Sequence, residues 1–230
     1  PRTLGSMMLR PGLAYTGVTR NHLAAVHIPF VFAIDDTAII ELTEQSMLVK
    51  VDEAWVSRAA VSTAVTSGDF SAATGWADGD EAGAASTISG GALFLIGTGI
   101  NAAIRTQQVT VAGGDQNVEH ALNITVTRGP VTLRVGSTSG ADDYVSETSL
   151  DTGFHSLAFT PAGNFYIQFS SRRVPASVVD SCVVAPSGPM VVTAPWAEAD
   201  LPMIRYDQSA DVVFVACEGY QPRRIERRGV

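Results

Sequence analysis

The stretch that decides the fold is Asn164-Phe165-Tyr166-Ile167-Gln168-Phe169, in which polar and apolar side chains alternate. A period of two places successive side chains on opposite faces of an extended chain, so this stretch predicts a β-strand with one buried face. Similar strand patterns occur at residues 132–135 (TLRV) and 211–215 (DVVFV). The sequence therefore predicts an all-β protein.

Turn residues separate the predicted strands at intervals of about 8–12 residues, which is typical of sandwiches, barrels and propellers. Examples are Ser89-Gly90-Gly91 and Arg128-Gly129-Pro130. The only helical signal is one short turn at residues 194–201, with Pro195 near its start.

The composition of the chain excludes several classes of function. The chain has 230 residues, of which 46% are hydrophobic and 17% charged, so it can build a sizeable core and is not disordered. The net charge of −8 argues against a general nucleic-acid binder, which needs basic surface. Apolar runs fall short of the roughly 18–20 residues that span a bilayer, so we expect no membrane span.

The middle of the chain differs from both ends. Residues 59–188 hold about twice as many acids as bases and much Gly, Ser and Thr, whereas the two ends are nearly balanced in charge. We therefore predict a host β domain built from residues 1–58 and 189–230, with a β-sandwich inserted at residues 59–188. Insertion is tolerated where a surface loop brings the two ends of the insert together.

The middle segment resembles a carbohydrate-binding-module jelly roll of the galactose-binding-like kind. The resemblance rests on an opening Gly-Asp-Phe with a following Gly-Trp, on three strands and on a closing Val-Asp strand. These are residues 68–70, 75–76, 107–111, 129–136, 153–160 and 179–181. The resemblance implies a fold and leaves the ligand open.

The two ends resemble tail nozzle (tail tubular) proteins of podovirus-like tailed phages. The matching elements are residues 9–15, 27–32, 38–42 and 47–51 before the insert, then 204–215 and 217–227 after it. Cys217-Glu218-Gly219 and Gln221 depart from the family pattern of His-Pro-x and Pro. The resemblance implies a virion component with a propeller-like body, assembled in the host cytoplasm as a homo-oligomer, a hexameric ring.

Nothing in the sequence marks an enzyme. The four histidines lie outside any nucleophile-elbow context, and no motif singles out a pair of carboxylates for glycoside hydrolysis. Cys182 and Cys217 lie in apolar, strand-like runs without metal-ligand spacing, which is typical of buried thiols. We predict a protein that is not an enzyme and has no cofactor, apart from the calcium alternative below.

Candidate glycan-binding residues are Tyr144, with its neighbours Asp142 and Asp143, and Trp76. Aromatic faces stack on sugar rings, and carboxylates accept hydrogen bonds from sugar hydroxyls. Tyr144 is predicted to be the best exposed aromatic residue of the insert. The alternatives are that Trp76 belongs to the core and that the insert is decoration or packs between subunits.

Two charged clusters each have two interpretations. Asp78, Asp80 and Glu81 form either a structural Ca²⁺ site, which the jelly-roll resemblance implies, or a solvated acidic turn. The C-terminal arginines form either a subunit or DNA-conduit interface or an ordinary solvated strand edge. These are Arg223, Arg224, Arg227 and Arg228.

The leading hypothesis is a nozzle ring subunit of a phage tail. It would contact portal or adaptor and tail fibre proteins, pass DNA as cargo, and reach fibres or host-surface glycan through the insert. The acidic net charge suits a conduit that does not hold DNA. The alternative is a non-catalytic carbohydrate-binding module of a secreted or surface polysaccharide-active protein.

Overall fold

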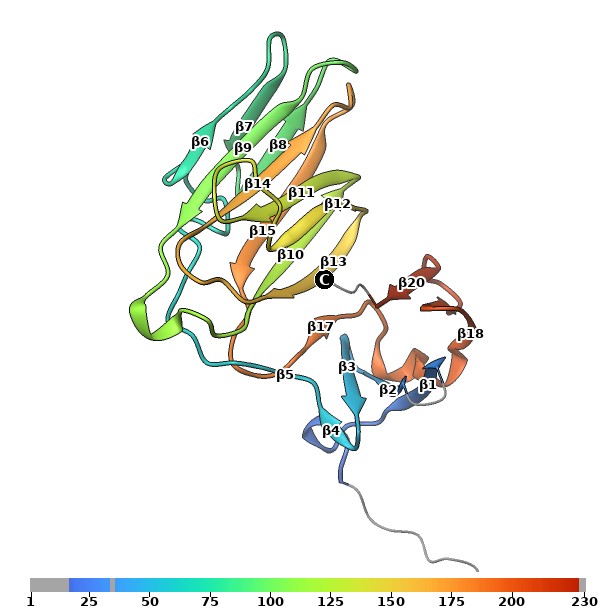
Figure 1. Cartoon of the computed structure of the whole chain (residues 1–230). Coiled ribbons are helices and arrows are strands. Elements are labelled where there is room, and N and C mark those ends of the chain that lie inside the picture. The colour runs from blue at the N-terminus through green and yellow to red at the C-terminus, as the bar shows by residue number, and fades with distance from the viewer. Residues whose placement is uncertain (1–16, 34–35, 228–230) are drawn as a thin grey trace, which may run out of the picture.

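The computed structural model describes residues 17–33 and 36–227 and consists of two bodies of β-structure (Figure 1). In the part of the chain it describes, the helical segments are three short 3-10 turns. They are η1 (Arg20–His22), η2 (Gly113–Asp115) and η3 (Glu198–Met203). The all-β prediction is confirmed. No helix in the described ranges is long and apolar enough to cross a membrane.

The larger body is a sandwich of two antiparallel five-stranded sheets. One sheet runs, in spatial order, β13 (Gly153–Phe159), β10 (His120–Arg128), β15 (Ser177–Val184), β8 (Ala92–Ile96) and β7 (Ala85–Ser89). The other runs β12 (Val145–Leu150), β11 (Val131–Gly136), β14 (Phe165–Ser171), β9 (Ala103–Val109) and β6 (Trp76–Asp78). Strands that follow one another in the chain mostly alternate between the sheets, as in a jelly roll.

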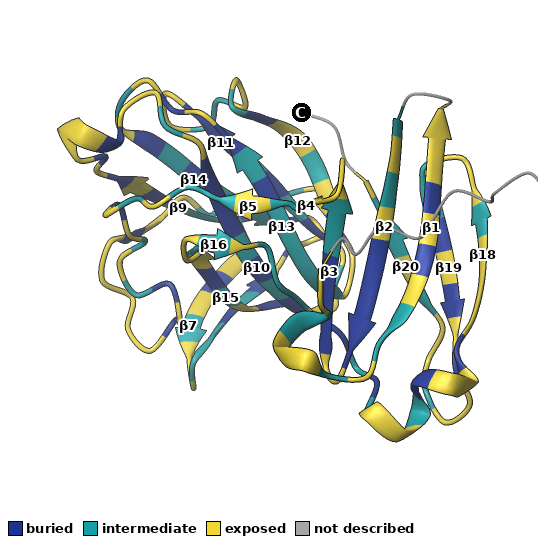
Figure 2. Ribbon diagram, turned by 90° about the horizontal axis from the view of Figure 1, so that it is seen from below, coloured by how far each residue is buried: buried dark blue, intermediate teal, exposed yellow. Residues whose placement is uncertain are grey.

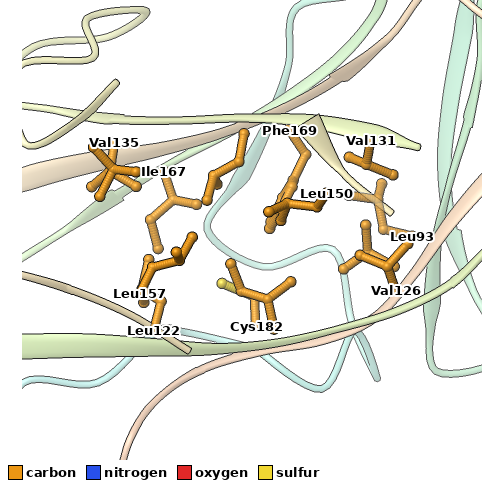
Figure 3. Close-up of a cluster of buried hydrophobic side chains, with 14 of the residues drawn as sticks. Leu93, Leu122, Val126, Val131, Val135, Leu150, Leu157, Ile167, Phe169 and Cys182 are labelled. Carbon is orange, nitrogen blue, oxygen red and sulfur yellow. The ribbon is translucent and has the colours of Figure 1, made fainter. Parts of the chain in front are cut away.

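The core of this sandwich lies between the two sheets (Figure 3). Phe165, Ile167 and Phe169 of β14 are fully buried, whereas the residues between them are half-buried. They face the opposite sheet, from which Leu122 and Cys182 point inward. The alternation seen in the sequence is therefore the alternation between core and outer face, as predicted.

The smaller body draws on both ends of the chain. Its first sheet holds β1 (Val26–Ala33), β2 (Asp36–Thr43), β3 (Ser46–Val51) and β17 (Val192–Thr193), with β4 (Ala54–Trp55) paired to β3. Its second sheet holds β18 (Arg205–Ser209), β19 (Val212–Ala216) and β20 (Arg223–Glu226). Strands such as β2 and β19 are dark with buried residues in Figure 2. The propeller-like arrangement implied by the resemblance remains a prediction.

One hydrophobic core joins the two ends within the smaller body. Ile28 and Ile40 come from before the larger body in the sequence, and Trp196, Val213 and Val215 come from after it. All five side chains are at most 3% exposed. The ends of the chain thus fold together around the long middle segment.

The chain passes between the two bodies at two neighbouring strands. β5 (Ser57–Arg58) pairs antiparallel with β16 (Gly188–Pro189), so Arg58 lies opposite Gly188. Arg58 itself is 10% exposed and donates to Ser156 Oγ (3.0 Å) and Glu119 Oε1 (3.3 Å) of the larger body. The domain boundaries at 58/59 and 188/189 remain a prediction.

The two cysteines lie in different cores. Cys182 packs in the sandwich core and Cys217 in the core of the smaller body, and both are free thiols. Each therefore packs as a small hydrophobic residue.

Candidate functional site

Trp76 is a core residue. It is 4% exposed and lies between Phe70 and Phe169, with ring centroids 5.1 and 5.9 Å away. Its indole nitrogen donates to the Ser67 carbonyl oxygen (3.2 Å). The prediction that Trp76 contacts a glycan is corrected, because neither face of the ring is open to a sugar.

Tyr144 and its acidic neighbours stabilise a loop. The Tyr144 ring is half-buried and stacks on Phe159, with the ring centroids 6.0 Å apart, so only part of the ring is open to solvent. That Tyr144 is the best exposed aromatic residue of the insert stays a prediction. Asp143 accepts a hydrogen bond from the Ser137 amide (2.8 Å), which holds the pKa of the Asp143 carboxyl below its usual range. Asp142 is exposed and accepts from the Glu147 amide (2.9 Å).

The proposed calcium ligands do not converge on one point. Asp80 accepts from the Ile104 amide (2.6 Å), Glu81 accepts from the Ala102 amide (2.6 Å), and Asp78 pairs with Arg105 (3.2 Å). These bonds attach the β6–β7 loop to the start of β9. Across residues 17–33 and 36–227, no group of three or more His, Cys, Asp or Glu side chains is placed to hold a metal ion. The structure does not assemble the predicted site.

The C-terminal arginines separate onto different partners. Arg224 pairs with Asp151 (2.8 Å) of the larger body and Arg227 with Asp36 (2.6 Å) of β2. Arg223 lies opposite Val215, on the inner face of its sheet, and is half-buried. Arg228 lies outside the described residues. Arg224 and Arg227 therefore form ion pairs within the chain, and the role of these arginines between subunits stays a prediction.

A groove of about 340 Å³ lies on the outer face of the sheet that contains β14. Cross-strand pairing places Thr132 opposite Ser170 and Arg134 opposite Gln168. Residues directly opposite one another share a face of the sheet, so these four side chains form the groove floor. They flank the buried residues Leu133 and Phe169 on the same two strands and therefore point to the opposite, outer face of the sheet.

The sides of the groove combine polar side chains with three apolar residues, Ala102, Ile104 and Pro130. Glu147 and Ser149 of β12 form one side, and Glu81 on the β6–β7 loop belongs to the other. Arg134 donates through Nε to Glu147 Oε2 (2.8 Å) and through Nη1 to the Gly140 carbonyl oxygen (3.3 Å), which fixes it in the floor. Arg172 and Arg173 close the end of the groove beyond β14.

Sequence reasoning missed this groove. Its floor is the polar half of the alternating pattern that predicted the strands, so the signal was present. The pattern within one strand does not say which strands are neighbours. The groove floor forms only because β11 pairs with β14, which brings together polar residues from two distant segments.

A larger cleft of about 1180 Å³ lies between the two bodies. Apolar side chains of β3 and β13, including Met47, Val49 and Leu157, contribute to its walls, alongside Arg58 and Arg223. Hydroxyl side chains of β10, β12 and β13 also line it, but its walls are mainly apolar, whereas hydroxyl, amide and guanidinium groups form the floor of the groove. The groove is therefore the better candidate for a specific polar ligand.

The fold and the groove define a β-sandwich protein with a polar site on one sheet. Solved structures similar to the chain include two family 11 carbohydrate-binding modules of Clostridium thermocellum. The module of cellulosomal cellulase Lic26A-Cel5E is 14% identical over 56% of this chain and 96% of its own, with a TM-score of 0.35. The module in complex with a β-1,3-1,4-mixed-linked tetrasaccharide is 13% identical over 57% and 99%, with a TM-score of 0.34.

No family model matches the chain, and no curated protein matches it.

Proposed function

We propose that the protein binds a glycan chain in the groove on the β14 sheet and catalyses no reaction on it. The single observation that carries the proposal is the floor of four hydrogen-bonding side chains, Thr132, Arg134, Gln168 and Ser170, on adjacent strands. Positions on regular strands are fixed more precisely than positions on loops.

The chemistry of the groove matches a ligand rich in hydroxyl groups. The Thr132 and Ser170 hydroxyls and the Gln168 amide each donate and accept, as sugar hydroxyls do. The Glu147 carboxylate accepts only, and Arg134 donates only. A volume of about 340 Å³ is at the small end of ligand sites, which suits one or two sugar units of a longer chain.

The experiment that tests this proposal is affinity electrophoresis of the full chain in native gels that contain soluble polysaccharides. Gln168→Ala should abolish the retardation seen for the wild type, because the amide lies at the centre of the floor. Asn123→Ala is the matched control, since Asn123 is a half-buried amide on the outer face of the other sheet. Retardation that survives Gln168→Ala, or that Asn123→Ala removes equally, would argue against the groove.

A second candidate function is the nozzle subunit of a phage tail. The observation that favours it is the common core of the two chain ends, since the resemblance joins those same ends into one host domain. The ring, its portal, adaptor and fibre partners and its place in the virion are part of this proposal. Native mass spectrometry of the full chain tests it: hexamers would support a ring, and a monomer at all concentrations would oppose it.

A further inference from the structure

Two consecutive arginines are held rigidly at the end of the groove. The Gly97 amide donates to the Arg173 carbonyl oxygen and the Gly99 amide to the Arg172 carbonyl oxygen, both at 2.7 Å. A Cβ atom on Gly97 would lie 2.4 Å from the Arg172 carbonyl carbon, so only glycine permits this approach. The backbone that carries both guanidinium groups is thus fixed before any ligand arrives.

Among the described residues, no carboxylate pairs with either of these two arginines. Arg173 donates through Nη1 to the Gly129 carbonyl oxygen, which carries no net charge. Within the described part of the chain, neither Arg172 nor Arg173 has a carboxylate within 4.0 Å. Arg134, by contrast, is paired with Glu147.

Glu81, the remaining acid of the groove, does not cancel the positive charge of the two arginines. Glu81 directs Oε2 to the Ala102 amide and contributes one negative charge against two positive ones. The net charge of −8 over the whole chain acts from further away. At physiological salt, exposed charges more than about 8 Å apart are largely screened, so the arginines in contact with a ligand dominate.

We infer that the groove selects acidic glycans, whose carboxylate or sulfate groups bind Arg172 and Arg173. This inference rests on the proposed glycan-binding function and names its ligand class. The planar guanidinium group donates two parallel hydrogen bonds to such an anion, and charge-assisted bonds of this kind are stronger than bonds to neutral hydroxyls. The hydroxyl and amide groups of the floor then bind the sugar ring beside the acid.

The test uses pairs of polysaccharides that differ in charge but share a backbone. Polygalacturonate is compared with its fully methyl-esterified form, and dextran sulfate with dextran, by isothermal titration calorimetry of the full chain. Mixed-linkage β-glucan serves as a further neutral probe. We expect at least one acidic probe to bind roughly tenfold more tightly than its neutral partner, with affinity falling as salt is raised.

Variants assign the effect to the arginines. Arg172→Gln should remove most of the preference for the acidic probe, because it weakens binding of the acidic probe more than binding of its neutral partner. Arg172→Lys should keep part of the preference, because it retains the charge without the planar fork. Arg128→Gln, at an exposed arginine on β10 of the other sheet, is the matched control, and circular dichroism confirms that each variant is folded.

The outcomes separate the inference from the function on which it rests. Equal binding of acidic and neutral probes would overturn the acid preference and leave glycan binding standing. An acid preference that survives both Arg172→Gln and Arg173→Gln would also overturn the inference. No binding of any probe would overturn the glycan-binding function together with the inference. A carboxylate-only or sulfate-only response identifies which acid is recognised and supports the inference.

Discussion

Asp115 is the most heavily bonded carboxylate in the described part of the chain. Its Oδ2 atom accepts from the amide and hydroxyl groups of both Ser62 and Thr63, at 2.8–2.9 Å. The Thr63 hydroxyl in particular lowers the pKa of the Asp115 carboxyl, since these bonds favour the charged form. The single carboxylate thereby attaches the segment that enters the larger body.

The lowered pKa makes stability depend on pH in a defined direction. The contribution of Asp115 is fully present above the pKa of the unfolded chain and is lost as pH falls through the lower folded pKa. Asp115→Asn should therefore lower the melting temperature at pH 7 and have less effect near pH 3. Asp180→Asn, at an exposed acid on β15, is the control. A variant that melts like the wild type at pH 7 would contradict this role.

A second prediction at the residue scale concerns the contribution of Trp76 to the stability of the core. Trp76→Ala should destabilise the larger body by about 3–5 kcal/mol, the usual cost of emptying a large aromatic site in a core. The fraction that remains folded should bind glycan as the wild type does. Urea unfolding and affinity electrophoresis of the same sample check both statements, and a loss of binding without a loss of stability would restore Trp76 as a contact residue.

At the scale of elements, Gln208 links two sheet edges. Its side-chain amide donates to the Val31 carbonyl oxygen (2.7 Å) and accepts from the Val31 amide (3.1 Å), as a neighbouring strand would. The same nitrogen donates to the Ala210 carbonyl oxygen (2.7 Å). One side chain thus connects β1 to the β18–β19 hairpin.

Gln208→Ala should destabilise the smaller body by roughly 1–2 kcal/mol, because about 1 kcal/mol is typical of each net hydrogen bond and this contact is exposed. Gln208→Glu keeps the acceptor and loses the donor, so its stability should lie between that of the wild type and that of Gln208→Ala. Hydrogen exchange should show the Val31 amide losing protection while the amides of β14 are unaffected. Unchanged exchange at Val31 would contradict the link.

The elements that the sequence predicted well are those whose signal is local. The alternation at residues 164–169 is sufficient to predict strand β14 and the burial of Phe165 and Phe169. The groove was not predictable, because its floor needs the register of Thr132 against Ser170, which a local pattern does not contain. The partial burial of Tyr144 is not predictable for the same reason: Phe159, on which its ring stacks, belongs to a different strand.

For the whole molecule, two separate cores predict two unfolding steps. Among the described residues, the larger core gathers 22 buried side chains and the smaller core 12, so the smaller body should unfold at lower denaturant. Each core contains one buried cysteine whose thiol pKa is raised by burial, which leaves little reactive thiolate in the folded state. Cys217 should therefore react with a thiol reagent at lower urea concentrations than Cys182.

Single-cysteine variants make this measurement direct. Cys182→Ala leaves Cys217 as the reporter of the smaller body, and Cys217→Ala leaves Cys182 as the reporter of the larger one. A polypeptide of residues 59–188 should reproduce the Cys182 step by itself. Coincident labelling of both thiols, or failure of that polypeptide to fold, would show that the two bodies are one cooperative unit.

The pairing of β5 with β16 has a consequence for evolution. Arg58 and Gly188 lie opposite one another in an antiparallel pair, so their Cα atoms are about 5 Å apart. A short turn is enough to span that gap, and the smaller body would keep its chain path without the intervening sequence. Sequence changes between these two positions can therefore alter the larger body, and the glycan site proposed on it, without altering the chain path of the smaller body.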